Sequence, residues 1–141
     1  MKWALKCSLF LGAFVLFINI QPTFSQQKSF SKLQIYFFTQ EDNTILTVNE
    51  DGTKNMTFQV KGLKDDDDAS QFISTLKLYK GIIDIRISKP LSNEFRQVTA
   101  LCHRGYTLNN VNVVFGEVFN INEVFVNGQR IEINKLEQTY Q

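Results

Sequence analysis

The stretch "MTFQVKGLKDDDDASQFISTLKLYKGIIDIRI", residues 56–87, decides the fold because its hydrophobic period changes twice. Apolar and polar residues alternate over 56–61, recur at spacings of three and four over 69–79, and alternate again over 83–87. Alternation predicts a half-buried strand, whereas spacings of three and four predict a helix with one apolar face. The stretch therefore predicts a strand, a helix that ends at Gly81, and a second strand.

Four consecutive aspartates, Asp65 to Asp68, stand at the start of the predicted helix. Their mutual repulsion is offset by the partial positive charge of a helix N-terminus, which favours each carboxylate by about 0.3–1 kcal/mol. Asp68, with Gln71 three residues later, is the expected N-cap of a capping box. The simpler interpretation is a well-capped, solvated loop, and the alternative is that the carboxylates face a cation.

The remainder of the chain repeats the same order of elements. A strand is predicted over 95–102, a helix after Thr107, a strand over 121–126, a tight turn at 127–128 and a return strand over 130–133. This order predicts an α+β protein with a ferredoxin-like βαββαβ antiparallel sheet, two helices on one face and a C-terminal hairpin strand.

The two central strands of that sheet are expected over 56–61 and 95–102. Right-handed crossovers predict that they lie side by side and parallel. Residues that follow the first strand and residues that end the second would then meet at one edge of the sheet.

Apolar residues after the aspartate run keep a fixed spacing, with Phe72 four residues after Asp68, Leu76 eight after it, and Gly81 thirteen after it. With Gly62 ahead of the run, this spacing resembles the heavy-metal-associated domain family, the fold of copper chaperones and of the N-terminal modules of metal-pumping ATPases. The resemblance covers about residues 56–127 and implies the ferredoxin-like fold.

The chain departs from that family at the residues that carry its function. The family's two metal-binding cysteines correspond to positions 65 and 68, and both are aspartates here. Thiolates select soft ions such as Cu(I), whereas carboxylates do not. The resemblance therefore does not extend copper chaperoning to this chain.

A different metal site is an alternative hypothesis. If the central strands end at one edge, then Asp65, Asp68, Cys102 and His103 come within reach of one another, and this donor set suits Zn(II) or Cu(II). Consecutive strand residues point to opposite faces, which weighs against Cys102 and His103 sharing an ion. The capped loop remains the favoured interpretation, with no cofactor.

The N-terminus predicts export. Lys2 and Lys6 precede an apolar run over 9–18, and small residues follow, which is the pattern of a secretory signal peptide cleaved after Ser25. We therefore expect residues 1–25 to be a signal peptide, the mature protein to be periplasmic or secreted, and no membrane span to remain after cleavage.

Cleavage changes the charge and the cysteine count. Without Lys2 and Lys6, 13 of the 15 basic residues remain against 14 acidic ones, a net charge of −1, which excludes the basic surface expected of a nucleic-acid-binding protein. Cys102 is then the only cysteine, so no intramolecular disulfide can form. A lone thiol is a small buried apolar group, a metal ligand or a site of mixed-disulfide formation.

The chain is expected to hold one domain at 56–134, preceded by an N-terminal extension at 26–55 with a candidate β-hairpin and followed by a polar tail at 135–141. His103 has no obvious catalytic partners. We therefore predict an exported, non-enzymatic binding or interaction module with an envelope protein as its partner. The alternative function is a periplasmic protein that binds Zn or Cu.

Overall fold

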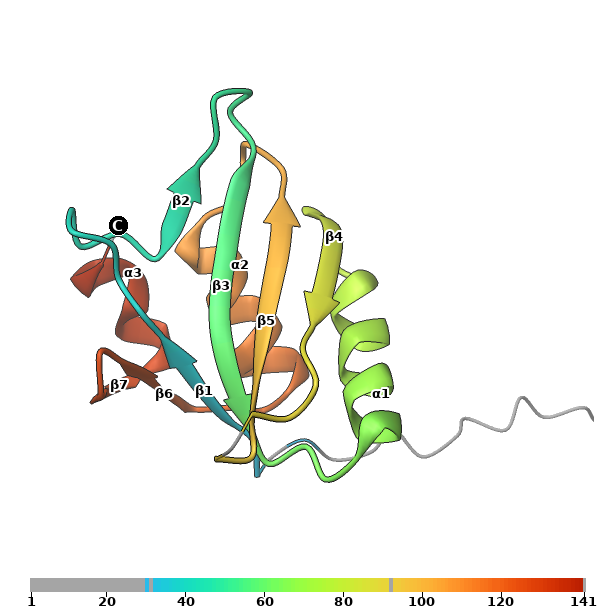
Figure 1. Ribbon diagram of the computed structural model, residues 1–141. Helices are drawn as coiled ribbons and strands as arrows, with labels where there is room; N and C mark the ends of the chain where they lie inside the picture. Colours follow the sequence, from blue (N-terminus) through green and yellow to red (C-terminus); the bar gives the residue numbers. More distant parts are fainter. Residues whose placement is uncertain (1–29, 31, 92, 141) are drawn as a thin grey trace, which may run out of the picture.

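The computed structural model describes residue 30 and residues 32–91 and 93–140, so the predicted signal peptide lies outside the described residues. Strands from all parts of the described chain join one twisted sheet, and the helices lie behind it in Figure 1. The strands are β1 (Gln34–Phe37), β2 (Leu46–Val48), β3 (Lys54–Lys61), β4 (Ile82–Ile87), β5 (Phe95–Cys102), β6 (Glu123–Val126) and β7 (Gln129–Glu132). The α-helices are α1 (Asp66–Lys77), α2 (Leu108–Asn112) and α3 (Leu136–Thr139).

The order of the strands overturns the ferredoxin-like prediction. The sheet is mixed and has seven strands in the described part of the chain, in the order β4-β5-β3-β1-β6-β7, with β2 also paired to β3. β1 lies between β3 and β6, antiparallel to the first and parallel to the second. The N-terminal strand thus occupies the place next to β3 that the ferredoxin-like layout gives to the strand after the second helix.

The central strands β3 and β5 are antiparallel, so the prediction of a parallel pair is wrong. Lys54, at the start of β3, pairs with Cys102 at the end of β5, and Lys61 pairs with Phe95. The reason is geometric: the crossover through α1 makes β3 and β4 parallel, and β5 lies between them, antiparallel to both.

β1 and β2 both lie along the same side of β3. β1 pairs with residues 58–61 of β3, and β2 pairs with residues 54–56, so within the described residues these two strands pair with β3 and not with each other. The segment 38–45 loops out between them. Residues 34–37 are therefore part of the same sheet as the strands that follow residue 54.

Aromatic side chains fill the core between the sheet and the helices. Phe58 on β3 is fully buried, and its ring lies 5.6 Å from Phe37, 6.5 Å from Phe72 and 5.3 Å from Phe115. These rings come from β1, α1 and the turn that continues α2, so one cluster ties three elements to the middle of the sheet. The opposite face of the sheet has no helix over it in Figure 1.

Thr107 is the N-cap of the second helix as predicted, and its N–H donates to Asn110 Oδ1 at 2.8 Å. Beyond Asn112 it widens into a π-helix over Val113–Val118. Val114 and Phe119, five residues apart, are both buried, which fits the wider turn. Farther along, Leu136 of α3 is fully buried, within the segment expected to be a polar tail.

Candidate functional site

The aspartate run caps α1, but through a different residue from the one predicted. Asp65 is the N-cap, and its carboxylate accepts the Asp68 N–H at 2.8 Å. The Asp68 carboxylate is buried and accepts the Lys64 N–H at 3.0 Å, so two backbone donors at the helix start are satisfied reciprocally. α1 therefore starts at Asp66, and the prediction of Asp68 as N-cap is wrong.

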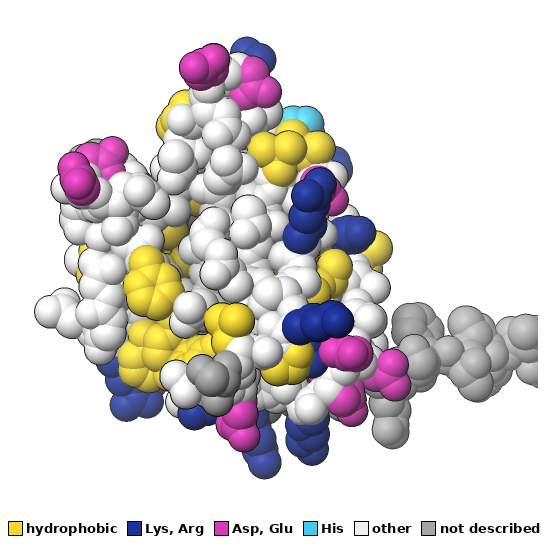
Figure 2. Space-filling view, in the orientation of Figure 1, with side chains coloured by type: hydrophobic (Ala, Val, Ile, Leu, Met, Phe, Trp, Pro, Cys, Tyr) yellow, Lys and Arg dark blue, Asp and Glu magenta, His cyan; other side chains and the backbone are white. Residues whose placement is uncertain are grey.

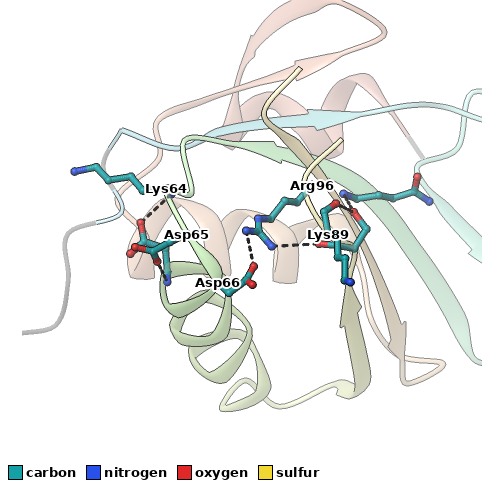
Figure 3. A network of polar contacts seen from close by, with 8 residues as sticks. Lys64, Asp65, Asp66, Lys89 and Arg96 are labelled. Atoms are coloured by element: carbon teal, nitrogen blue, oxygen red, sulfur yellow. Dashed lines mark hydrogen bonds and ion pairs between the residues drawn. The ribbon is translucent and has the colours of Figure 1, made fainter. Parts of the chain in front are cut away.

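A third aspartate, Asp66, forms an ion pair with Arg96. Asp66 Oδ1 accepts from Nη2 of Arg96 at 2.8 Å, and Figure 3 shows the Arg96 side chain reaching from β5 to the start of α1. The Arg96 side chain is 5% exposed and that of Asp66 is 87% exposed, so the pair joins a buried guanidinium to a solvated carboxylate. Arg96 Nη1 also donates to the Ser88 carbonyl at 3.4 Å.

Arg96 is the cation that Asp66, at the start of α1, faces. It alternates in phase with Val98 and Ala100, so it lies on the helix-covered face of the sheet. A buried guanidinium needs a charged partner, and its Nε has no hydrogen-bond partner among the described residues. Of the four aspartates, Asp67 is the exposed one for which the structure gives no such contact.

The four residues of the predicted metal site lie at two ends of the sheet. Asp65 and Asp68 follow the end of β3, whereas Cys102 pairs with Lys54 at its beginning. The eight residues of β3 span seven steps between the two places, roughly 23 Å at about 3.3 Å per step. The premise that the strands end at one edge was wrong, so the fold does not assemble this donor set.

The chemistry at Cys102 agrees with a packing role. The side chain is fully buried, and burial raises the pKa of its thiol to about 11, although the nearby Lys54 ammonium acts in the opposite direction. His103 is exposed in the turn after β5, where its N–H donates to the Gly81 carbonyl at 2.8 Å. In the described ranges no group of three or more His, Cys, Asp or Glu residues is placed to hold a metal ion.

The uncovered face of the sheet carries a different constellation, which we call the aromatic row: Tyr36 on β1, Phe95 on β5 and Phe125 on β6. Tyr36 and Phe125 stack with ring centroids 4.6 Å apart and planes 10° apart. Phe95 meets Tyr36 edge-on at 5.1 Å, and the Lys61 ammonium lies 5.5 Å from the centre of the Phe95 ring. All three aromatic side chains are partly exposed.

Uncharged polar side chains continue this face beyond the aromatic row. Figure 2 shows a white central area with yellow side chains below it and charged side chains toward the margins. The central side chains are amides and hydroxyls on β3 and β5: Asn55, Thr57, Gln59, Gln97 and Thr99. We call this set the polar band.

A hollow adjoins the aromatic row at the β6 side. Its volume is about 300 Å³, and Gln34, Phe125, Glu123 and Arg130 are among the residues that line it. Glu123 and Arg130 form an ion pair between β6 and β7. The hollow therefore has one aromatic wall and a charged margin.

The sequence carries a signal for the aromatic row that the predictions did not include. Phe95 is out of phase with Val98 and Ala100 on the same strand, and Tyr36 stands between Ile35 and Phe37, which are both fully buried. Strand residues of opposite phase point to opposite faces, so these aromatics had to lie on the other side of the sheet from the core.

Comparison of the chain with family models, with curated proteins and with solved structures finds no match. The resemblance to the heavy-metal-associated family stays a prediction. Within residues 32–91 and 93–140, no helix is both long and apolar enough to cross a membrane.

Proposed function

We propose that this protein is an exported, non-enzymatic binding module that docks a protein of the cell envelope on the open face of its sheet. The observation that carries the proposal is the aromatic row, three aromatic side chains on a face that no described helix covers. Aromatic side chains in such a place add little to the packing of the core. At protein interfaces, by contrast, aromatic residues supply much of the binding energy.

The layout of the face matches the general anatomy of protein interfaces. Interface centres are enriched in aromatic residues and depleted of charge, and charged residues gather at the rim. Here the aromatic row and the polar band carry only Tyr, Phe, Asn, Gln and Thr side chains. Lys61 lies against the Phe95 ring at the end of β3, and Arg86, Glu123 and Arg130 lie toward the margins.

The face is also prepared for binding before a partner arrives. The Tyr36 ring is fixed between Phe95 and Phe125, and its hydroxyl donates to Gln34 Oε1 at 3.0 Å. Side chains that are already ordered lose little entropy on association. The hollow beside Phe125 offers a place for one anchoring side chain of the partner.

The state of Cys102 is compatible with an extracytoplasmic location. Signal cleavage would leave it as the only cysteine in an oxidising compartment. Its burial and its raised pKa, about 11, keep it as a protonated thiol that oxidants attack slowly. The Cys102 thiol can therefore stay reduced without a second cysteine as a disulfide partner.

The test places a photo-crosslinking amino acid on each side of the mature protein, which is produced in its native cells. Thr57 in the polar band reports on the open face, and Ser74 on α1 is the matched control, since both are exposed and hydroxyl-bearing. We expect a discrete adduct from position 57 and none from position 74. Equal adducts from both positions, or none from either, would contradict the proposal.

The partner identified by the adduct then allows a quantitative measurement with purified proteins. Phe125→Ala removes the stacked ring and one wall of the hollow, so we expect the Kd to rise at least tenfold. Ser74→Ala should leave the Kd unchanged. Unchanged binding by Phe125→Ala would show that the aromatic row is not the contact surface.

A further inference from the structure

β4 leaves one edge of the sheet open. It pairs with β5 on one side, and in the described part of the chain no strand pairs with the other side. Its register shifts between Ile82 and Asp84 and is regular from Asp84 to Ile87. A regular, unpaired edge presents backbone donors and acceptors that another strand can bind.

We propose that β4 pairs antiparallel with β4 of a second copy of this chain, about a two-fold axis that passes between the two copies of Ile85. This inference does not depend on the proposed function, because it concerns the edge of the sheet and not its open face.

The direction of the backbone groups selects Ile85 as the centre. The Ser88 N–H donates to the Gln97 carbonyl at 2.8 Å, and the register continues with Ile87 opposite Val98. In an antiparallel ladder, hydrogen-bonded and non-hydrogen-bonded pairs alternate. Ser88 and Arg86 therefore bond to β5, whereas the N–H and C=O groups of Ile85 and Ile87 point out from the edge.

The side chains on either side of Ile85 carry opposite charges, so in an antiparallel pair of β4 strands each charge faces its opposite. Asp84 and Arg86 lie on the open face and form an exposed ion pair, with Arg86 Nε 3.3 Å from Asp84 Oδ2. With the axis at Ile85, Asp84 lies opposite Arg86 of the second copy, and Arg86 lies opposite its Asp84. Opposite charges directly across an antiparallel pair stabilise it, and the exposed ion pair within one chain is weak enough to be exchanged.

Other axes fail on the same observations. An axis at Arg86 places two arginines opposite each other and uses backbone groups that already face β5. An axis at Ile87 matches the backbone groups but places Asp84 opposite Pro90, which has no N–H and no charge. Only the axis at Ile85 satisfies backbone and charge together.

The sequence around β4 also holds exposed apolar side chains. Leu78 is 83% exposed, Ile83 is 47% exposed and Leu91 is 46% exposed, and all three lie within β4 or in the segments that flank it. With the axis at Ile85, β4 of the second copy would cover the edge beside Ile83, whose side chain the single chain leaves half exposed.

The test uses two charge reversals. Each is expected to abolish dimerisation alone, and a mixture of the two variants is expected to restore it. Asp84→Arg places arginines opposite arginines across the axis, and Arg86→Asp places aspartates opposite aspartates. We expect sedimentation velocity to show a concentration-dependent dimer of the wild type and a monomer of each variant. The series extends to about 0.5 mM, because a contact between two single strands is small and weak.

Mixing the two variants completes the test. Each strand then faces its opposite charge, so the mixture should sediment as a heterodimer with an affinity near that of the wild type, which also shows that both variants are folded. Arg104→Asp, an exposed reversal with the same change of charge as Arg86→Asp, should dimerise like the wild type. A monomeric wild type, dimeric single variants, or a monomeric mixture would each overturn the proposal.

Discussion

The two faces of the sheet are made by alternate residues of the same strands, yet they differ in almost every property. On β3, Met56 and Phe58 point toward the helices and are fully buried. Asn55, Thr57 and Gln59, their neighbours in sequence, point away and stay in contact with solvent. The difference shows that packing constrains one face and leaves the other available for binding.

The largest expected effect is at the middle of the buried face. Phe58→Ala removes a ring that contacts three other aromatic rings, so we expect it to lower the free energy of unfolding by about 3–5 kcal/mol. Thr57→Ala, one residue away on the open face, should change it by less than about 0.5 kcal/mol. Urea denaturation of both variants measures the contrast. Similar losses of unfolding free energy in the two variants would contradict it.

The second contrast is in the reactivity of the Cys102 thiol between the folded and the unfolded protein. With its pKa raised from the ordinary value of 9.0 to about 11, the folded protein holds about a hundredfold less thiolate at pH 8 than the unfolded chain. A thiol-specific reagent should therefore label the native protein slowly and the urea-unfolded protein rapidly. Rapid labelling of the native protein would place Cys102 outside the core.

The same shift predicts a dependence of stability on pH. Above pH 9 the thiol of the unfolded chain loses its proton, while the folded protein keeps it until about pH 11. The unfolded state is then favoured, so this group's contribution to stability is complete below pH 9 and is lost as pH rises to 11. In Cys102→Ala, the decline in the free energy of unfolding over that interval should be smaller.

Arg96 is a buried charge on the helix-covered face, and its ion pair with Asp66 gives the third contrast. Asp66→Asn removes the carboxylate of that pair, and we expect a loss of about 1–2 kcal/mol, limited by the exposure of Asp66. Arg96→Met removes the buried charge itself and should cost less, within about 1 kcal/mol of the wild type. Thermal denaturation ranks the two variants, and a greater loss in Arg96→Met would contradict the account.

The smallest effect is expected within the aspartate run. Asp65→Ala removes the N-cap of α1 and should cost about 1 kcal/mol, because the Asp68 N–H loses its acceptor. Asp67→Ala, two residues farther on and exposed, should cost less than about 0.5 kcal/mol. Matched denaturation curves compare them, and equal losses would show that the four carboxylates act only as a shared charge.

Local pattern was enough to find most of the elements. The alternation of Met56, Phe58 and Val60 and the spacing of Phe72 and Leu76 correspond to β3 and α1. These patterns report which face of an element is buried, and this is a property of neighbouring residues. The position of the helix start within four identical aspartates has no such local signature, since each is an equally good N-cap.

The arrangement of the strands could not be obtained in the same way. Periodicity does not name the neighbour of a strand, so nothing in residues 34–37 indicated a place between β3 and β6. The four predicted ligands lie apart for this reason, because their proximity depended on the direction of β5. The aromatic row was accessible in principle, since the phase of Phe95 against Val98 sets its face without knowledge of any partner strand.

The central position of β1 has a consequence for how the chain folds. Its contacts with β3 join segments that are close in the sequence, whereas Tyr36 pairs with Phe125, near the other end of the sequence. Until β6 is in place, β1 is an open edge that other chains or chaperones can bind. We expect chains truncated before β6 to be strongly engaged by chaperones in the compartment where the protein folds, and full-length chains to be released once the parallel pair closes.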